Sequence, residues 1–128
     1  MKNSGIKLWK EAIKIIPGGN SILSKRPERY LPDLWPTYFK KAKGIHIWDL
    51  DGNKYMDMAQ MGIGSSILGY SNAEVNKAVS IAIKEGISTT LNSKDEFILA
   101  KKLLKLNKGF SSVKFARSGG EAMSIAVR

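Results

Sequence analysis

Residues 45–58, IHIWDLDGNKYMDM, have the residue pattern of a β-hairpin. Apolar and polar side chains alternate on both sides of the tetrapeptide Leu50-Asp51-Gly52-Asn53, as they do in half-buried strands. Asp, Gly and Asn at a tight connection favour a hairpin because these residues tolerate positive φ. The stretch therefore predicts antiparallel β-structure over residues 38–58.

Three aspartates, Asp49, Asp51 and Asp57, lie in or beside this hairpin. Their spacing does not match an EF-hand loop, so turn and strand-edge roles are predicted instead of a metal site. The chain has no cysteine and a single histidine, which excludes disulfides, thiolate sites and multi-histidine zinc sites.

On the N-terminal side, an amphipathic helix is predicted to end at Pro17-Gly18-Gly19, with an apolar stripe of Ile6, Trp9, Ile13 and Ile16. Residues 20–36 contain three of the four prolines and predict an irregular, basic connection.

On the C-terminal side, residues 59–71 are rich in glycine and serine, which allows a close backbone approach to a ligand or to another segment. Two helices are predicted to follow, beginning with the capping boxes of residues 71–74 and 93–96. A short strand is then expected at residues 113–116. The final apolar stripe continues to Arg128 without a stop signal, which predicts a truncated chain.

The formal net charge is +10, from 21 basic and 11 acidic residues in a chain of 128. Such a charge is compatible with a small module that binds nucleic acid or other anions, but a lysine-rich solvated surface is favoured because the lysines are spread singly or in pairs. No apolar run approaches the roughly 18–20 residues that span a bilayer, and no secretory signal is recognisable. A cytoplasmic protein without membrane or nucleic-acid partners is expected.

The residues Ser118, Gly119 and Gly120 form the candidate anion site, which we call the phosphate cup. They follow the predicted strand and begin a helix, where free amides and the macrodipole attract anions. The glycines leave those amides accessible, and Ser118 adds a hydroxyl. The alternative is that Ser118 and Glu121 form only a third capping box.

With these residues included, the chain resembles the N-terminal third of class III pyridoxal-phosphate-dependent aminotransferases. The resemblance is strongest to their glutamate-1-semialdehyde 2,1-aminomutase-like branch. Residues 41–57 are similar to its small-domain hairpin, and residues 15–21 and 67–70 to its neighbouring segments. Residues 114–122 resemble its strand-to-helix phosphate loop, usually Ser-Gly-Thr-Glu-Ala, with Gly120 here in place of the threonine.

The resemblance implies an α/β fold of type I, of which this chain would hold the N-terminal portion. Residues 1–58 would supply the N-terminal helix and the small-domain hairpin, and residues 59–128 the start of the large domain. Pyridoxal 5′-phosphate would be the cofactor, with its phosphate at Ser118, Gly119 and Gly120, and the enzyme would be a homodimer.

The same resemblance implies transfer of an amino group between small molecules, to or within a keto or aldehyde substrate. Ser21 would lie on the substrate side. The aminomutases have an arginine three residues after this serine, whereas here Ser24 stands there, with Lys25 and Arg26 displaced. A keto-sugar or polysaccharide precursor is therefore the expected acceptor.

No lysine of this chain matches the family's cofactor-binding lysine, so no catalytic residue is assigned within it and no turnover is expected from it alone. Two other functions stay open: the small basic anion- or nucleic-acid-binding module, and a protein that pairs with another aminotransferase-like chain.

Overall fold

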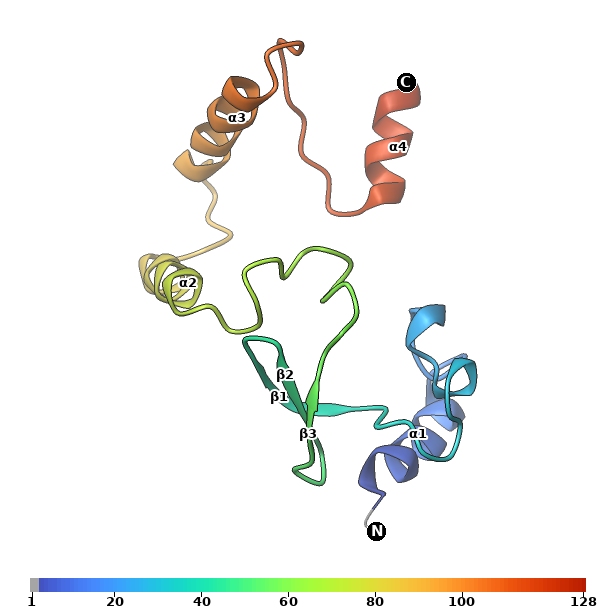
Figure 1. The fold of residues 1–128 in the computed structure, drawn as a ribbon. Helices are drawn as coiled ribbons and strands as arrows, with labels where there is room; N and C mark the ends of the chain where they lie inside the picture. Colours follow the sequence, from blue (N-terminus) through green and yellow to red (C-terminus); the bar gives the residue numbers. More distant parts are fainter. Residues whose placement is uncertain (1–2) are drawn as a thin grey trace. The chain divides into compact units, whose positions relative to one another are not determined.

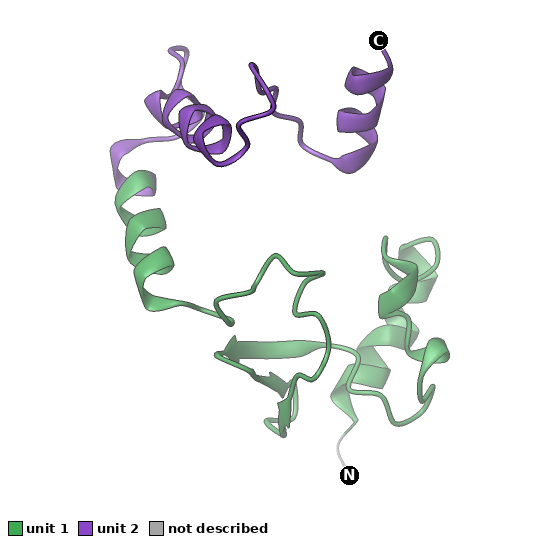
Figure 2. Ribbon diagram, turned by 45° about the horizontal axis from the view of Figure 1, so that its top comes forward, with its two compact units in different colours: residues 1–82 green, residues 83–128 purple. Residues whose placement is uncertain are grey.

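The computed structural model describes residues 3–128, and these form two compact units, residues 1–82 and residues 83–128 (Figure 2). Each unit is described by itself. The helices and strands, labelled in Figure 1, are α1 (Ser4–Ile15), β1 (Phe39–Lys43), β2 (His46–Asp49), β3 (Lys54–Met56), α2 (Ala73–Glu85), α3 (Lys94–Leu106) and α4 (Gly119–Val127). Two single turns of 3₁₀-helix lie at residues 23–25 and 27–29.

The three strands form one antiparallel sheet in the order β1-β2-β3 (Figure 1). Ile47 in the central strand pairs with Ala42 on one side and with Tyr55 on the other. The prediction of antiparallel structure over residues 38–58 is therefore confirmed, and the turn between β2 and β3 falls at the predicted residues.

The turn between β2 and β3 is organised by one buried carboxylate, that of Asp49. Its oxygens accept hydrogen bonds from the backbone N–H groups of Asp51 and Asn53, from the Asn53 side-chain amide and from the Tyr55 hydroxyl. The predicted turn role is thus confirmed for Asp49. Among residues 3–128 no cluster of three or more side chains is arranged to hold a metal ion.

The stability of this turn is expected to decrease as the pH falls into the acid range. Burial raises the pKa of Asp49, but the hydrogen bonds from Asn53, Tyr55 and Asp51 outweigh it, so the pKa lies below its ordinary value of 3.8. A lowered folded-state pKa means that the stabilisation is complete above about pH 4 and is lost as the pH falls through the folded-state value.

Asp49→Asn is accordingly expected to lower the free energy of unfolding by about 1–3 kcal/mol at pH 7, because a buried charged acceptor is lost. The difference in free energy of unfolding between variant and wild type should become smaller below about pH 4. Urea titrations followed by circular dichroism measure it. The exposed Asp33 provides the control, and Asp33→Asn should show no such difference. A difference for Asp49→Asn that stays constant down to about pH 2 would contradict the prediction.

Helix α1 begins after Asn3, whose side chain accepts from the N–H of Ile6, and it ends before Pro17 as predicted. The Asp51 carboxylate accepts hydrogen bonds from the N–H and hydroxyl of Ser4, which connects the hairpin turn to the first residue of the helix.

The buried side of α1 is narrower than the predicted apolar stripe. Ile6, Trp9 and Ala12 are buried, whereas Ile13 and Ile16 are 49% and 42% exposed, so the stripe was wrong at its last two positions. The reason is tertiary: within the first unit the helix is covered by parts of residues 19–37, which reach only one side of it.

The glycine-rich segment makes one close backbone approach to another segment. Gly69, at φ +84°, lies beside Gly44, where a Cβ on residue 69 would come within 3.2 Å of the Gly44 Cα and carbonyl oxygen. The neighbouring Tyr70 exchanges two backbone hydrogen bonds with Gly44. Of the two predicted uses of this segment, contact with another segment is therefore confirmed for Gly69.

Helices α2 and α3 lie where the sequence predicts them, but their caps differ. Ser93 accepts from the N–H of Asp95 and caps α3 as predicted. In front of α2 the capping acceptor is Asn72, whose Oδ1 receives the N–H groups of Glu74 and Val75. Ser71 was predicted for this role, but it is in the left-handed region at φ +53°, where its side chain receives a bond from Asn76 instead.

The short strand predicted at residues 113–116 is not present in the described structure. A strand needs a hydrogen-bonded neighbour, and the second unit, residues 83–128, contains no strand with which these residues could pair. The boundary predicted between residues 58 and 59 concerns the domains of a larger fold and stays a prediction. Within residues 3–128 no helix is long and apolar enough to cross a membrane.

Candidate functional site: the N-terminus of helix α4

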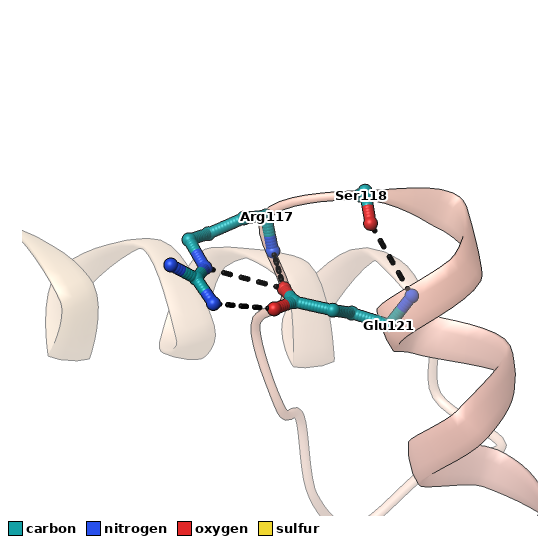
Figure 3. Close-up of polar contacts among 3 residues, drawn as sticks. All are labelled: Arg117, Ser118 and Glu121. Carbon is teal, nitrogen blue, oxygen red and sulfur yellow. Dashed lines mark hydrogen bonds and ion pairs between the residues drawn. The ribbon is translucent and has the colours of Figure 1, made fainter.

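The phosphate cup lies at the first turn of α4 and begins with Ser118 as N-cap (Figure 3). The backbone of Ser118 is extended, with φ −146° and ψ 160°, and its Oγ accepts the N–H of Glu121 at 3.3 Å. This bond leaves the hydroxyl hydrogen of Ser118 free to donate to an external acceptor. The predicted cap is therefore present, and it is compatible with a ligand.

The two glycine amides that follow Ser118 are open donors. Helix geometry gives the first amides of α4 no internal acceptor, and the rest of residues 3–128 offers none to Gly119 or Gly120. Together with the positive end of the α4 macrodipole, they can receive an anion.

Nothing in the described chain requires glycine at these two positions. Neither Gly119 nor Gly120 has a positive φ. A Cβ at Gly119 would have no atom within 4 Å, and one at Gly120 would meet only Ser118 Oγ at 4.0 Å. Glycine costs up to about 1 kcal/mol in helix propensity, so its use here fits a ligand that must approach the backbone.

The Glu121 carboxylate turns back to Arg117, the residue before the cap (Figure 3). Glu121 Oε2 accepts the Arg117 backbone N–H at 2.8 Å, and Oε1 lies 2.6 Å from Arg117 Nη2. The hydrogen bonds from the Arg117 guanidinium, and then from its backbone, lower the pKa of Glu121. The negative charge in the first turn is therefore already paired.

An open hollow of about 780 Å³ lies beside the cup, within the second unit. It is lined by Phe115, Ala116, Arg117, Ser118, Gly120, Glu121, Ser124, Ile125 and Arg128. Its lining residues include two arginines, Arg117 and Arg128, and two serines, Ser118 and Ser124, together with Glu121, whose carboxylate is paired with Arg117. Arginine and serine side chains are hydrogen-bond donors that a phosphate can accept from.

Of the predicted site residues, the structure brings Ser118, Gly119 and Gly120 together. Ser21 lies in the first unit, exposed in the bend that follows α1. The Arg26 side chain lies against the segment that follows α1, where a Cβ at Gly18 would lie 2.0 Å from Arg26 Nη2. Arg26 Nε is buried and has no hydrogen-bond partner among the described residues.

Arg117 was not among the predicted site residues. The sequence feature that could have indicated its role is the spacing of four residues between the opposite charges of Arg117 and Glu121. On a helix, this spacing places two side chains on one face. Because Arg117 stands before the first helical residue, that rule did not apply to it directly.

Comparison with known proteins gives one family. The profile described as aminotransferase class-III matches residues 32–128. The glutamate-1-semialdehyde 2,1-aminomutase of Francisella philomiragia is 37% identical over 122 residues, which cover 94% of this chain and 28% of that protein. The chain thus spans less than a third of the length of this relative.

Solved structures agree with this match. An omega-transaminase from Sphaerobacter thermophilus superposes with a TM-score of 0.83 at 25% identity, over 97% of this chain and 27% of that one. A transaminase with PLP bound superposes with a TM-score of 0.85 at 27% identity, over 99% of this chain and 28% of that one. These matches confirm the predicted α/β fold of a type I transferase, and residues 1–128 belong to the class-III aminotransferase family.

Proposed function

We propose that residues 1–128 form the N-terminal part of a pyridoxal-phosphate-dependent aminotransferase or aminomutase, and that Ser118, Gly119 and Gly120 bind the cofactor phosphate. The observation that carries this proposal is the open α4 N-terminus, with two unpaired glycine amides where nothing in the chain itself requires glycine. Membership of the class-III aminotransferase family supports the same cofactor.

The residues of the cup act by binding and orientation. The N–H groups of Gly119 and Gly120 donate to phosphate oxygens, and Ser118 adds its hydroxyl hydrogen. When bound, pyridoxal 5′-phosphate supplies an electron sink for the bonds at the carbon that carries the amino group. Residues 1–128 anchor the phosphate end of the cofactor and contain no residue that we assign to catalysis.

The proposed reaction moves an amino group between small molecules, to or within a keto or aldehyde substrate, with Ser21 on the substrate side. The preferred acceptor is a keto-sugar or polysaccharide precursor. In support, Ser24 stands where the aminomutases have an arginine, and Arg26, two positions further on, lies against Gly18 in the described structure. We further propose a cytoplasmic homodimer, with residues 1–58 in a small domain and residues 59–128 in a large one, and no turnover from these residues alone.

The proposal predicts that binding depends on the phosphate. In the natural gene product that contains this chain, pyridoxal 5′-phosphate should bind about 100-fold more tightly than pyridoxal, as a group held by charge-assisted hydrogen bonds should. Ser118→Ala should weaken binding of the phosphorylated form about 10-fold and leave pyridoxal unchanged, because one hydrogen bond to a charged group is lost. Absorbance titration of each ligand measures both affinities.

Ser93→Ala is the matched control, since Ser93 is also a serine N-cap whose hydroxyl oxygen accepts a backbone N–H of the first turn, and it lies outside the cup. It should leave both affinities unchanged. Equal affinity of the wild type for the two ligands would refute the proposal.

A further inference from the structure

Glu121 does more than an ordinary capping box requires. In such a box the glutamate at the third helical position bonds the N–H of the cap residue itself. Here its carboxylate passes Ser118 and accepts the N–H of Arg117, one residue earlier, and the guanidinium of the same residue. The Glu121 side chain therefore makes contacts that the capping box alone does not explain.

Helix α3 offers a direct comparison within the same chain. Its capping box, Ser93 to Glu96, has the same spacing of serine and glutamate as Ser118 to Glu121. Ser93 receives the N–H of Asp95, and the Glu96 side chain has no hydrogen bond or ion pair among residues 3–128. The carboxylate contacts of Glu121 are therefore a feature of the α4 terminus and not of the motif.

Glu121 connects Ser118, the first residue of the cup, and Arg117, the residue before it, to the first turn of the helix. Its carboxylate holds the backbone of Arg117, and its own N–H holds the Oγ of Ser118 (Figure 3). With the Arg117 N–H and one Ser118 lone pair engaged, the donors that the cup itself leaves for an anion are the Ser118 hydroxyl hydrogen and the amides of Gly119 and Gly120.

The positive guanidinium of Arg117 offsets the negative charge that Glu121 brings close to the cup. An unpaired carboxylate within the first helical turn would repel a phosphate, because both groups carry negative charge. The ion pair, at 2.6 Å between Nη2 and Oε1, offsets that charge while the carboxylate keeps its hold on the backbone.

We infer that Glu121 is the positioning residue of the phosphate cup and that Arg117 is its charge partner. Glu121 holds the backbone at residues 117 and 118 so that the open donors converge, and Arg117 keeps the carboxylate from repelling the ligand. This inference rests on the proposed function, since it assigns the parts of the same phosphate site.

The test uses the natural gene product and compares affinities for pyridoxal 5′-phosphate and pyridoxal. Glu121→Ala should weaken binding of the phosphorylated ligand at least about 10-fold and leave pyridoxal unchanged, because the donors lose their common orientation. Glu121→Gln keeps an oxygen that can accept the Arg117 N–H, so it should remain within about 3-fold of wild type. Glu96→Ala is the matched control and should change neither affinity.

The charge role has its own test. Arg117→Ala leaves the Glu121 carboxylate unpaired and should weaken binding of the phosphorylated ligand about 5-fold. Adding Glu121→Gln to Arg117→Ala removes that charge and should restore the affinity. In Arg117→Ala, the chemical shift of the phosphorus NMR signal from the bound ligand should change with pH, whereas in Glu96→Ala it should not. A merely structural role for Arg117 would not produce this difference.

The outcomes separate the two proposals. Equal binding of both ligands by the wild type refutes the proposed function, and the inference with it. A wild type that prefers the phosphorylated ligand, together with an unchanged preference in Glu121→Ala, overturns the inference alone. A Glu121→Ala protein that loses both ligands to the same extent also overturns it, because the effect then does not act through the phosphate.

Discussion

Gly120→Asp is expected to weaken the binding of pyridoxal 5′-phosphate by the natural gene product at least about 100-fold, because it places a carboxylate among the donors of the phosphate cup. A Cβ at this position would have open space around it, with only Ser118 Oγ at 4.0 Å, so the new side chain can be accommodated. The loss would then come from charge and blocked access, and not from misfolding.

The same substitution should not weaken the helix, and this separates binding from folding. Aspartate in the first turn of α4 interacts favourably with the macrodipole, and it replaces a residue of poor helix propensity. Hydrogen exchange of the α4 amides in the protein without ligand should therefore be as slow as in the wild type, or slower.

Gly109→Asp is the matched control for Gly120→Asp. Gly109 also has no atom within 4 Å of an added Cβ and no positive φ, and it lies outside the cup. It should leave the affinity for pyridoxal 5′-phosphate unchanged. Full affinity in Gly120→Asp would show that the phosphate does not lie at the α4 N-terminus.

Trp9→Ala is expected to lower the stability of the first unit by about 3–5 kcal/mol, the range for removal of a buried tryptophan. Trp9 is 5% exposed, and its Nε1–H donates to Glu28 Oε1 at 2.7 Å. Its ring also lies against Gly19, where a Cβ would come within 2.3 Å of it. Few other side chains of residues 3–82 are buried, so the remaining core cannot compensate.

Hydrogen exchange of the α1 amides measures this loss locally, even where other parts of the protein stay folded. Trp35→Ala serves as the control: Trp35 is 37% exposed and stacks on Tyr30 at 4.4 Å between ring centroids. Its removal should cost about 1 kcal/mol, the contribution of an aromatic pair. Similar losses for the two variants would contradict a core centred on Trp9.

Most features that depend on residues close in sequence were predictable, with the cap of α2 as an exception, since Asn72 and not Ser71 supplies it. The hairpin turn follows from the Asp51-Gly52-Asn53 chemistry, and the end of α1 from Pro17. The cap at Ser118 also follows, because its acceptor and donor lie three residues apart. The turn and the cap rest on hydrogen bonds made within one turn of chain, so the sequence contains both partners side by side, and Pro17 ends α1 because it has no backbone N–H.

Features that depend on a distant partner were not predictable. Residues 113–116 have strand composition but no strand beside them in the second unit, so no ladder forms. The exposure of Ile13 and Ile16 reflects which segments cover α1, and an apolar pattern does not specify what covers it.

The candidate site divides differently, because the contact that was not predicted joins Glu121 to Arg117, only four residues away. By itself, the sequence determined that Ser118, Gly119 and Gly120 stand at a helix start, that the glycines leave the backbone accessible, and that Ser118 caps the helix. Only the three-dimensional structure decided which nearby group the Glu121 carboxylate bonds. It could have bonded the N–H of Ser118, faced a ligand or pointed to solvent, and these alternatives differ by single hydrogen bonds of similar strength. The structure selects Arg117, because its backbone N–H and guanidinium both come within reach of one carboxylate.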